Sequence, residues 1–500
     1  NVELLSSAIP GDSAGGASTS QALSRSQISS NDGRWALYAS AAANLVPGVT
    51  DYNGGSDVFL YDRDTNQSML VSRSAASSNR AANGVSLPTA ISSDGRYVLY
   101  YSAATDLVSG VTDDNGSELD VFLFDRISQS TVLVSRSGSS SNLTANGSSR
   151  ATALSADGRY VLYSSVASNL VSGLTDENEA ADIFLFDRDN PTSILISHPA
   201  NAPTTTLVGD SQAVALSADG AFVLFSSTAP DVVNGISDNN GANPDVFLYE
   251  RASGIASLVS RSASSASQTG NDYSRPIAFS ADGLFVLYSS AASDVLSGIT
   301  DNNGAEDVFL YDRINGTALL VSRSAGSATI TANNVSIATT LSADGRYVLF
   351  ASDATDVVTG VSDGNNDRDV FLFDRNSGTS GLVSRSGPAA TTTANTAAYA
   401  SALSADGSYV LYASDATNVI TSLVDTNNSA DVFLFDRNNN SSSLVSRTAS
   451  SSVQTANAYS EASALSADGR FALLFSYAND LVAGSDLNNN ASRGNNRAQK

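Results

Sequence analysis

The sequence predicts an all-β protein, and within that class a β-propeller with about eight four-stranded blades. Three observations support this prediction: a repeat of about 62 residues, four strand-like segments in each repeat, and a middle pair of segments that is apolar on both faces. The first landmark of the repeat is an Asp-Gly step that recurs every 62 or 63 residues, at Asp32, Asp94, Asp157, Asp219, Asp282, Asp344, Asp406 and Asp468. A second landmark, Asp-Val/Ile-Phe-Leu-Tyr/Phe-Asp/Glu-Arg, begins at Asp57, Asp120, Asp182, Asp245, Asp307, Asp369 and Asp431. So regular a period means that one supersecondary unit is stacked many times.

The repeat around Asp282 shows how each element follows from its residues. Strand-like segments lie at 275–280, 284–289, 307–313 and 318–323. They are separated by residues that favour turns, namely Asp282-Gly283, residues 301–304 and Asn315-Gly316. The second and third segments are nearly continuous apolar runs, so we expect both of their faces to be buried, whereas the fourth alternates more.

Four short antiparallel strands with a buried middle pair are what a propeller blade requires, because each blade is sandwiched between two neighbours. No segment shows a period near 3.6 residues, which excludes a helical solenoid. Four strands joined by long polar connections also fit poorly in the coils of a parallel β-helix.

The ends of the chain predict how the ring closes. Residues 2–7 resemble an eighth copy of the fourth strand, so the chain begins with an outer strand and ends inside a blade. We therefore expect the N- and C-terminal segments to pair. The third strand of the last blade should begin near Arg493, yet 488–500 lacks the apolar motif, so this end is either degenerate or truncated. The prediction is a single propeller domain over 1–500, with 1–20 as the closing strand and its connection, 21–487 as the repeats, and 488–500 as the degenerate or truncated end.

The composition limits the classes of partner. Net charge is -24, apolar residues make up 42%, and cysteine is absent. The apolar share suffices for a packed core. So acidic a surface repels nucleic acid and anionic membranes, and it favours divalent cations. No apolar run approaches the roughly 18 residues of a membrane span. We therefore expect no nucleic-acid partner and no direct membrane insertion.

The repeat resembles a known family. Residues 155–163 (Ser-Ala-Asp-Gly-Arg-Tyr-Val-Leu-Tyr) and 307–313 (Asp-Val-Phe-Leu-Tyr-Asp-Arg) are similar to the TolB-like (WD-type) β-propeller repeats of bacterial secreted and periplasmic proteins. Similarity is greatest to bacterial surface proteins whose blades carry Asp-x-Asn-Gly-x-x-Asp-Val-Phe. The resemblance implies an extracytoplasmic bacterial protein, secreted, on the cell surface or periplasmic, and often one module of a larger chain. It implies no activity, because propellers host many unrelated functions.

The sharpest candidate site is the loop before the third strand, where Asp-x-Asn recurs in every repeat. Alternating oxygen ligands closed by a further carboxylate can converge on Ca²⁺, the only cofactor we expect. The same residues also form Asx turns without any metal, and this simpler interpretation is the favoured one. The candidate ligands are Asp51, Asn53, Asp57, Asp113, Asn115, Asp120, Asp176, Asn178, Asp182, Asp238, Asn240, Asp245, Asp301, Asn303, Asp307, Asp363, Asn365, Asp369, Asp425, Asn427 and Asp431, with an eighth pair at Asp486 and Asn488.

Two further groups recur, and both have structural interpretations. An Asn eleven residues before the turn aspartate is expected to fix a loop through its amide, at Asn83, Asn146, Asn271, Asn333, Asn395 and Asn457. The Asp-Arg pair that ends the third strand, from Asp62-Arg63 to Asp436-Arg437, is expected to be a structural ion pair rather than an anion site.

Catalytic residues are not identified. His198 is the only histidine and stands where the other repeats have Arg, so we interpret it as a structural substitution. Trp35 occupies a second-strand aromatic position and is expected in the core. The function predicted first is therefore a non-enzymatic structural, adhesive or assembly module that contacts proteins or surface glycans through its loop faces, with self-assembly among its roles. The alternatives are a glycan- or peptide-binding propeller and, third, a sugar-active enzyme.

Overall fold

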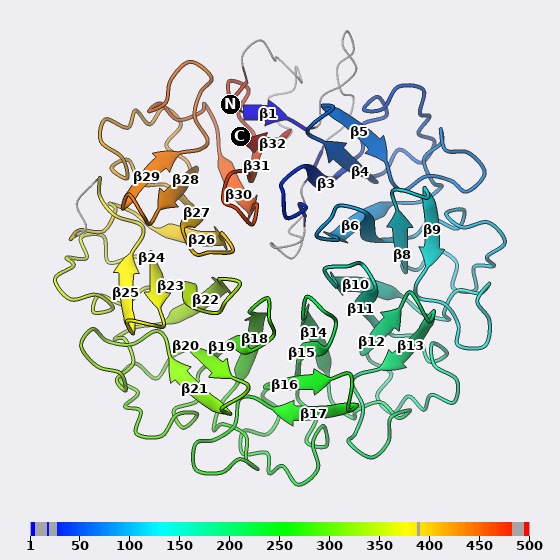
Figure 1. The fold of residues 1–500 in the computed structure, drawn as a ribbon, viewed down its shortest axis with the longest axis horizontal. Helices are drawn as coiled ribbons and strands as arrows, with labels where there is room; N and C mark the ends of the chain where they lie inside the picture. The colour runs from blue at the N-terminus through cyan, green and yellow to red at the C-terminus, as the bar shows by residue number, and fades with distance from the viewer. Residues whose placement is uncertain (1, 6–17, 20–27, 388–390, 483–494, 500) are drawn as a thin grey trace.

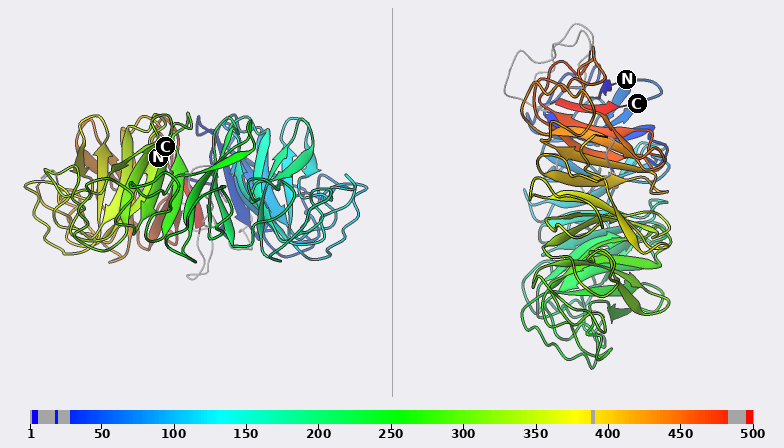
Figure 2. Two further views of the ribbon diagram at one scale, coloured as in Figure 1. Left: turned by 90° about the horizontal axis from the view of Figure 1, so that it is seen from below. Right: turned by 90° about the vertical axis from the view of Figure 1, so that its left-hand side faces the viewer.

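The computed structural model describes residues 2–5, 18–19, 28–387, 391–482 and 495–499. Within these residues the chain forms eight four-stranded antiparallel sheets and no helix. The sheets stand as blades around one axis (Figure 1), and the molecule is a flattened disc when seen from the side (Figure 2). The predicted eight-bladed β-propeller is confirmed.

Each blade uses strands that are consecutive in the sequence, except the last. Blade 1 contains β2 (Ser18–Thr19), β3 (Trp35–Ser40), β4 (Asp57–Asp62) and β5 (Gln67–Leu70). Blade 2 contains β6 (Ser86–Ile91), β7 (Tyr97–Ser102), β8 (Asp120–Asp125) and β9 (Ser130–Leu133). Blade 3 contains β10 (Ser149–Leu154), β11 (Tyr160–Ser165), β12 (Asp182–Asp187) and β13 (Thr192–Leu195). Blade 4 contains β14 (Ser211–Leu216), β15 (Phe222–Ser227), β16 (Asp245–Glu250) and β17 (Ile255–Leu258).

The second half of the ring repeats this plan. Blade 5 contains β18 (Ser274–Phe279), β19 (Phe285–Ser290), β20 (Asp307–Asp312) and β21 (Thr317–Leu320). Blade 6 contains β22 (Ser336–Leu341), β23 (Tyr347–Ser352), β24 (Asp369–Asp374) and β25 (Thr379–Leu382). Blade 7 contains β26 (Ala398–Leu403), β27 (Tyr409–Ser414), β28 (Asp431–Asp436) and β29 (Ser441–Leu444). Blade 8 contains β30 (Ser460–Leu465), β31 (Ala472–Ser476), β32 (Asn495–Gln499) and β1 (Val2–Leu4).

The strand register gives the disc two distinct faces. In blade 6, Ser336 at the start of the first strand pairs with Ser352, which pairs with Asp369 at the start of the third strand. The Asp-x-Asn loop and the connection to the next blade therefore share one face, which we call the loop face. The Asp-Gly turn and the turn between the third and fourth strands lie on the opposite face, the turn face. First strands surround the axis and fourth strands lie at the periphery (Figure 1).

The core lies between blades rather than inside any one of them. The middle strands β23 and β24 are buried almost throughout, as their apolar runs predict. One hydrophobic cluster joins Leu287 and Leu310 of blade 5 to Val348 and Phe373 of blade 6. Burying such a side chain contributes about 1.5–3 kcal/mol, and a blade without neighbours would expose two apolar faces. The ring is therefore the smallest unit that buries both faces of every blade.

Pairing of the two chain ends closes the ring. Strand β1 pairs with β32, with Val2 opposite Gln499, and β32 pairs with β31. Leu5 is 1% exposed and packs in a cluster that includes Tyr38 of blade 1 and Leu473 of blade 8. This confirms the predicted closure by the terminal segments. The last third strand begins at Asn495, close to the expected position, and consists of Asn-Asn-Arg-Ala-Gln instead of the apolar motif.

The Asp-Arg pair at the end of the third strand does not act as one ion pair. Asp374 instead accepts two hydrogen bonds from Arg346, both 2.9 Å long. Arg375 donates to the carbonyl of Gly345 at 3.0 Å, and its guanidinium lies 4.2 Å from the centre of the Phe285 ring in the preceding blade. The dipeptide therefore serves two separate contacts, and the arginine joins neighbouring blades through a cation–π interaction.

Candidate functional site on the loop face

The Asp-x-Asn loops form the same hydrogen-bonded turn in blades 1 to 7, and blade 5 illustrates it. Asp301 Oδ1 accepts hydrogen bonds from the backbone N–H groups of Asn303 (3.0 Å) and Gly304 (2.8 Å). Asn303 Nδ2 donates to the carbonyls of Ala332 (2.7 Å) and Asn334 (3.1 Å), which belong to the connection into blade 6. The loop therefore fixes the path of the chain between two blades.

The residue after each Asp-x-Asn has a left-handed backbone. Gly304 has φ of 58° and Asn366 has φ of 50°. Glycine and asparagine adopt this conformation at low cost, which explains why they dominate the position. Blades 1, 2, 3, 4 and 7 share the geometry, at Gly54, Gly116, Glu179, Gly241 and Asn428. The eighth pair, Asp486 and Asn488, lies outside the described residues.

Blades 2 and 4 carry loops that are one residue longer. Elsewhere the Asn side-chain oxygen accepts a backbone N–H two residues on, as Asn303 does from Ala305 at 2.7 Å. In the longer loops, the buried oxygens of Asn115 and Asn240 have no hydrogen-bond partner among the described residues. The Nδ2 of Asn240 still donates to the carbonyl of Asp272 in the connection at 3.0 Å, and it also lies 3.4 Å from Asp245 Oδ1. The inserted residue thus changes the use of the amide without moving the turn.

The aspartate that begins the third strand is buried and hydrogen-bonded in blades 1 to 7. Asp307 is 3% exposed, and its Oδ1 accepts the hydroxyl of Ser322 at 2.9 Å. Ser322 Oγ in turn accepts the backbone N–H of Val308 at 2.8 Å. We call this chain the Asp–Ser anchor, because it ties the third strand to the end of the fourth. The other six anchors begin at Asp57, Asp120, Asp182, Asp245, Asp369 and Asp431.

Burial makes these seven carboxyl groups unusually weak acids. Loss of hydration raises the pKa of Asp307 to about 7, the Ser322 hydrogen bond opposes this shift, and the charge of Asp301 adds to it. The pKa of each of the other six anchor aspartates is also raised to about 7, with burial as the largest cause. The loop face therefore contains seven buried groups that change protonation near neutral pH.

The predicted calcium ligands come together, but several of their oxygens already have protein partners. Asp301 Oδ1 accepts hydrogen bonds from two backbone N–H groups, and Asn303 Oδ1 accepts one. Asp307 Oδ1 accepts a hydrogen bond from a hydroxyl group. Across the described part of the chain, no three His, Cys, Asp or Glu side chains are grouped so that they could hold a metal ion. The geometry is the one that turn formation requires, and calcium binding stays a prediction.

The second recurring group fixes the connection between blades, as predicted. Asn333 Oδ1 accepts the backbone N–H of Thr355 at 2.9 Å, and its Nδ2 donates to the Thr355 hydroxyl at 2.9 Å. The backbone N–H of Asn333 donates to Asp356 Oδ1 at 2.9 Å. The six connections that carry this Asn are thereby held on one side by the preceding Asp-x-Asn loop and on the other by the loop of their own blade.

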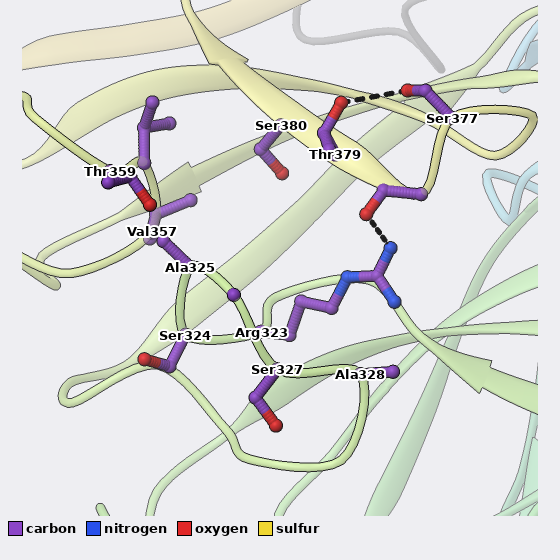
Figure 3. Close-up of a pocket in the computed structure, with 13 residues that line it drawn as sticks. Arg323, Ser324, Ala325, Ser327, Ala328, Val357, Thr359, Ser377, Thr379 and Ser380 are labelled. Carbon is purple, nitrogen blue, oxygen red and sulfur yellow. Dashed lines mark hydrogen bonds between the residues drawn. The ribbon is translucent and has the colours of Figure 1, made fainter.

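Grooves at the periphery repeat with the blades and are not specific to one of them. The groove in Figure 3 has a volume of about 510 Å³ and is lined by Arg323, Ser327 and Thr379, among others. Arg323 crosses it to donate to the carbonyl of Gly378 in the next blade. An equivalent groove of about 360 Å³ surrounds Arg73 between blades 1 and 2. Each of these arginines therefore links two neighbouring blades through a hydrogen bond to a backbone carbonyl.

His198 occupies the corresponding position in blade 3 and serves the same purpose. Its ring meets Tyr249 of blade 4 edge-on, with 5.8 Å between ring centres. In blade 6, Arg385 lies 4.7 Å over Phe435 of blade 7. The histidine therefore replaces a cation–π contact with an aromatic one, and its location agrees with a structural substitution. Trp35 is 8% exposed, and the guanidinium of Arg126 lies 4.0 Å from the centre of its ring. Trp35 therefore lies in the core, as predicted.

Comparisons with known proteins give similar folds only. No family model and no curated protein matches the chain. An oligogalacturonate lyase from Vibrio parahaemolyticus is 12% identical, with 83% of this chain and 93% of that chain covered and a TM-score of 0.42. TolB from Acinetobacter baumannii is 16% identical, with coverages of 77% and 75% and a TM-score of 0.32. A prolyl endopeptidase is 10% identical, with coverages of 96% and 55% and a TM-score of 0.45. At these values the similarities carry no argument about what this chain binds.

The prediction that the protein is not an enzyme is contradicted. Chains of similar structure include the oligogalacturonate lyase, a second such lyase in complex with manganese, and the prolyl endopeptidase. The absence of a recognisable catalytic motif in the sequence was therefore an insufficient reason to exclude catalysis.

Among the described residues, no helix is long and apolar enough to cross a membrane.

Proposed function

We propose that this protein is a rigid circular scaffold that binds partner proteins or surface glycans through its loop face, outside the cytoplasm. The observation that carries the proposal is the repetition of one hydrogen-bonded loop on one face, in blades 1 to 7. Weak contacts made by several tethered copies add up, because each contact after the first is intramolecular. The extracytoplasmic location is supported by the resemblance to TolB-like repeats.

The loops are suited to this role because they are already ordered. Asn303 fixes its loop to the neighbouring connection, so little side-chain and backbone freedom remains to be lost on binding. The net charge of -24 attracts basic partners over a distance set by ionic strength. Self-association is included in the proposal, with calcium as an ion that would bridge or stabilise the acidic loops.

The test compares charge-matched substitutions on the two faces. Asp114 and Glu177 are exposed on the loop face, and Asp64 and Asp189 are exposed on the turn face. We expect Asp114→Ser with Glu177→Ser to change concentration-dependent assembly in sedimentation velocity, or retention on a glycan array. The matched pair, Asp64→Ser with Asp189→Ser, should leave both unchanged. Identical behaviour of the two double variants in both measurements would contradict a loop-face interface.

A further inference from the structure

One part of the loop face departs from the repeat, and we call it the inner rim. In each blade it comprises the residue before the first strand, the second residue of that strand, the residue after the second strand and the residue before the third. In blade 2 these are Val85, Leu87, Ala103 and Leu119. In blade 6 they are Val335, Ile337, Asp353 and Arg368, in blade 7 Ala397, Tyr399, Asp415 and Ala430, and in blade 8 the first three are Tyr459, Glu461 and Tyr477. The rim therefore differs from blade to blade: blade 2 has small and aliphatic residues there, whereas blades 5 to 8 also carry aromatic or charged ones, with Tyr273 and Glu306 in blade 5. In blade 5 the carboxylate of Glu306 is already paired with Arg275.

Some of the rim residues of blades 6 to 8 line a cavity of about 600 Å³ between the first strands β22, β26 and β30. The three strands are neighbours around the axis (Figure 1). Lining side chains include Ile337, Arg368, Tyr399, Asp415, Tyr459 and Glu461. The volume lies within the range of small-ligand sites, which is roughly 300–1,000 Å³. We call it the inner-rim cavity.

The aromatic rings of the cavity are open to solvent. Tyr399 is 48% exposed and Tyr459 is 37% exposed. Tyr459 packs on Tyr477 of the same blade, with 6.1 Å between ring centres, and Tyr477 is itself 50% exposed. Three partly exposed tyrosines thus lie within two adjacent blades, and Tyr399 and Tyr459 line the cavity.

The charges of the cavity leave an excess of carboxylate. Arg368 is neutralised by Asp353 through two hydrogen bonds of 2.8 and 3.2 Å. Asp415 and Glu461 form no ion pair among the described residues, and Glu461 Oε2 only accepts the Tyr459 hydroxyl at 3.4 Å. Two carboxylates without a cationic partner therefore stand beside tyrosine rings.

We propose that the inner-rim cavity binds the cationic side chain of an arginine or lysine of a partner protein. Tyrosine faces attract a guanidinium or ammonium group, and the two carboxylates supply the opposite charge. The charge of -24 steers such a group toward the protein. A neutral sugar would also stack on tyrosine but would leave both carboxylates without a counter-charge. The inference rests on the proposed loop-face function and names the chemistry of one partner.

Binding of a minimal peptide tests the proposal. The probe is acetyl-Gly-Arg-Gly-amide, and its control is the same peptide with citrulline, which keeps the shape of arginine but has a carbonyl oxygen in place of one guanidinium NH2 group and no charge. Isothermal titration should show binding of the arginine peptide and at least tenfold weaker binding of the citrulline peptide. Binding of arginine should weaken further as salt is added.

Matched variants assign the binding to the cavity. Asp415→Asn with Glu461→Gln should weaken arginine binding by about tenfold, and Tyr399→Ala by about threefold, in line with exposed ion-pair and cation–π contributions. Glu118→Gln removes one negative charge at an exposed loop-face residue of blade 2 and should have no effect. All four substitutions are at solvent-facing positions, and equal melting temperatures will verify folding.

The outcomes separate this inference from the proposed function. Equal binding of arginine and citrulline peptides, or full binding by the Asp415/Glu461 variant, would overturn the cationic site. Binding of neutral oligosaccharides in place of the arginine peptide would do the same. If the peptide does not bind while the Asp114/Glu177 variant still loses assembly, only the inference fails. If the peptide binds but assembly does not depend on the loop face, only the proposed function fails.

Discussion

The bodies of the blades keep the same residue type from blade to blade, whereas the inner rim of the loop face does not. In the bodies, one residue type recurs at each position, as the Asp–Ser anchor of Asp307 and Ser322 does in seven blades. At the inner rim, Leu87 of blade 2 corresponds to Tyr399 of blade 7 and Glu461 of blade 8. A body strand packs against two neighbouring blades, so a change there must fit both interfaces. A rim residue borders solvent on one side, so the rim can vary without disturbing the ring. Variation on a constant frame is how a symmetric molecule can acquire a single binding site.

Opening the ring should have the largest effect on the bodies of the blades. Deletion of residues 1–5 removes β1 and the buried Leu5, and leaves β32 as an unpaired edge. We expect a stability loss of several kcal/mol, with about 2–5 kcal/mol from the Leu5 side chain alone, and aggregation through the exposed strand. Thermal melting and size-exclusion chromatography measure both effects.

A point variant controls for the deletion. Leu5 corresponds in the repeat to Val321 of blade 5, which is also fully buried. Leu5→Ala should therefore be at least as destabilising as Val321→Ala, since the larger side chain leaves the larger cavity. A Leu5→Ala protein that melts like the unaltered chain would show that the terminal strand does not close the ring in solution.

Breaking one anchor should cost less than opening the ring and more than the same change at the rim. Ser322→Ala leaves the Val308 amide and the Asp307 carboxyl buried without their shared partner. We expect a loss of about 1–3 kcal/mol in urea unfolding. Ser401→Ala is the matched control: this serine lines the inner-rim cavity and is 7% exposed, but its hydroxyl makes no hydrogen bond among the described residues, so the change should stay within about 0.5 kcal/mol. Equal losses of unfolding free energy in the two variants would contradict the proposed difference between the bodies of the blades and the rim.

The anchors also make stability depend on pH with an unusual sign. The pKa of Asp307 is about 7 in the folded protein and 3.8 as the ordinary value, so between these two pH values the folded state binds more protons than the unfolded state. Its contribution to stability is complete below about pH 4 and is lost as pH rises through about 7, with a slope of about 1.4 kcal/mol per pH unit for each such group. Melting temperature should therefore fall between pH 5 and pH 8.

Isosteric variants separate this effect from general charge repulsion. Asp307→Asn should reduce the slope of stability against pH by the share of one anchor aspartate, while Glu461→Gln, a charge change at the exposed rim, should leave the slope unchanged. Asp307→Asn also keeps an oxygen that can accept the Ser322 hydroxyl, so the fold should survive. A slope that is the same in all three proteins would mean that the anchor aspartates are already ionised at pH 5.

The sequence was sufficient for the bodies of the blades because their constraints repeat. Apolar runs of four or five residues in the second strand and Asp-Gly turns appear in every unit, and the strands follow from them. It failed where a contact depends on register or on closure. Asp374 pairs with Arg346, 28 positions away, rather than with the adjacent Arg375. Strand β32 has no apolar pattern from which it could be predicted. Its position is given by backbone pairing with β31 and β1.

The inner rim shows a further limit. Tyr399, Asp415 and Glu461 come from two blades and meet only through the packing of the ring. A repeat-by-repeat alignment would have marked their positions as variable, but not that they surround one cavity. The Asp-x-Asn motif had the reverse problem: its members do come together, and the spacing alone did not reveal how many of their oxygens would already be hydrogen-bonded.

Calcium should have the smallest effect, because the loop oxygens that already hold protein donors are poor ligands. At a calcium concentration equal to Kd, each site would stabilise the fold by about 0.4 kcal/mol. Metal binding requires an ionised carboxylate, so the gain should be larger at pH 8 than at pH 5, where Asp307, with its pKa of about 7, is mostly protonated. Asp301→Asn with Asp307→Asn should remove one site's share of the gain, and the comparison needs constant ionic strength because any salt screens the acidic surface. Melting temperatures in millimolar calcium and in chelator that agree at both pH values would leave Asp301, Asn303 and Asp307 as turn and anchor residues alone. A calcium gain that appears only at pH 8 and shrinks in the double variant would instead place the ion between the loop and the anchor, in the constant part of the molecule rather than at its rim.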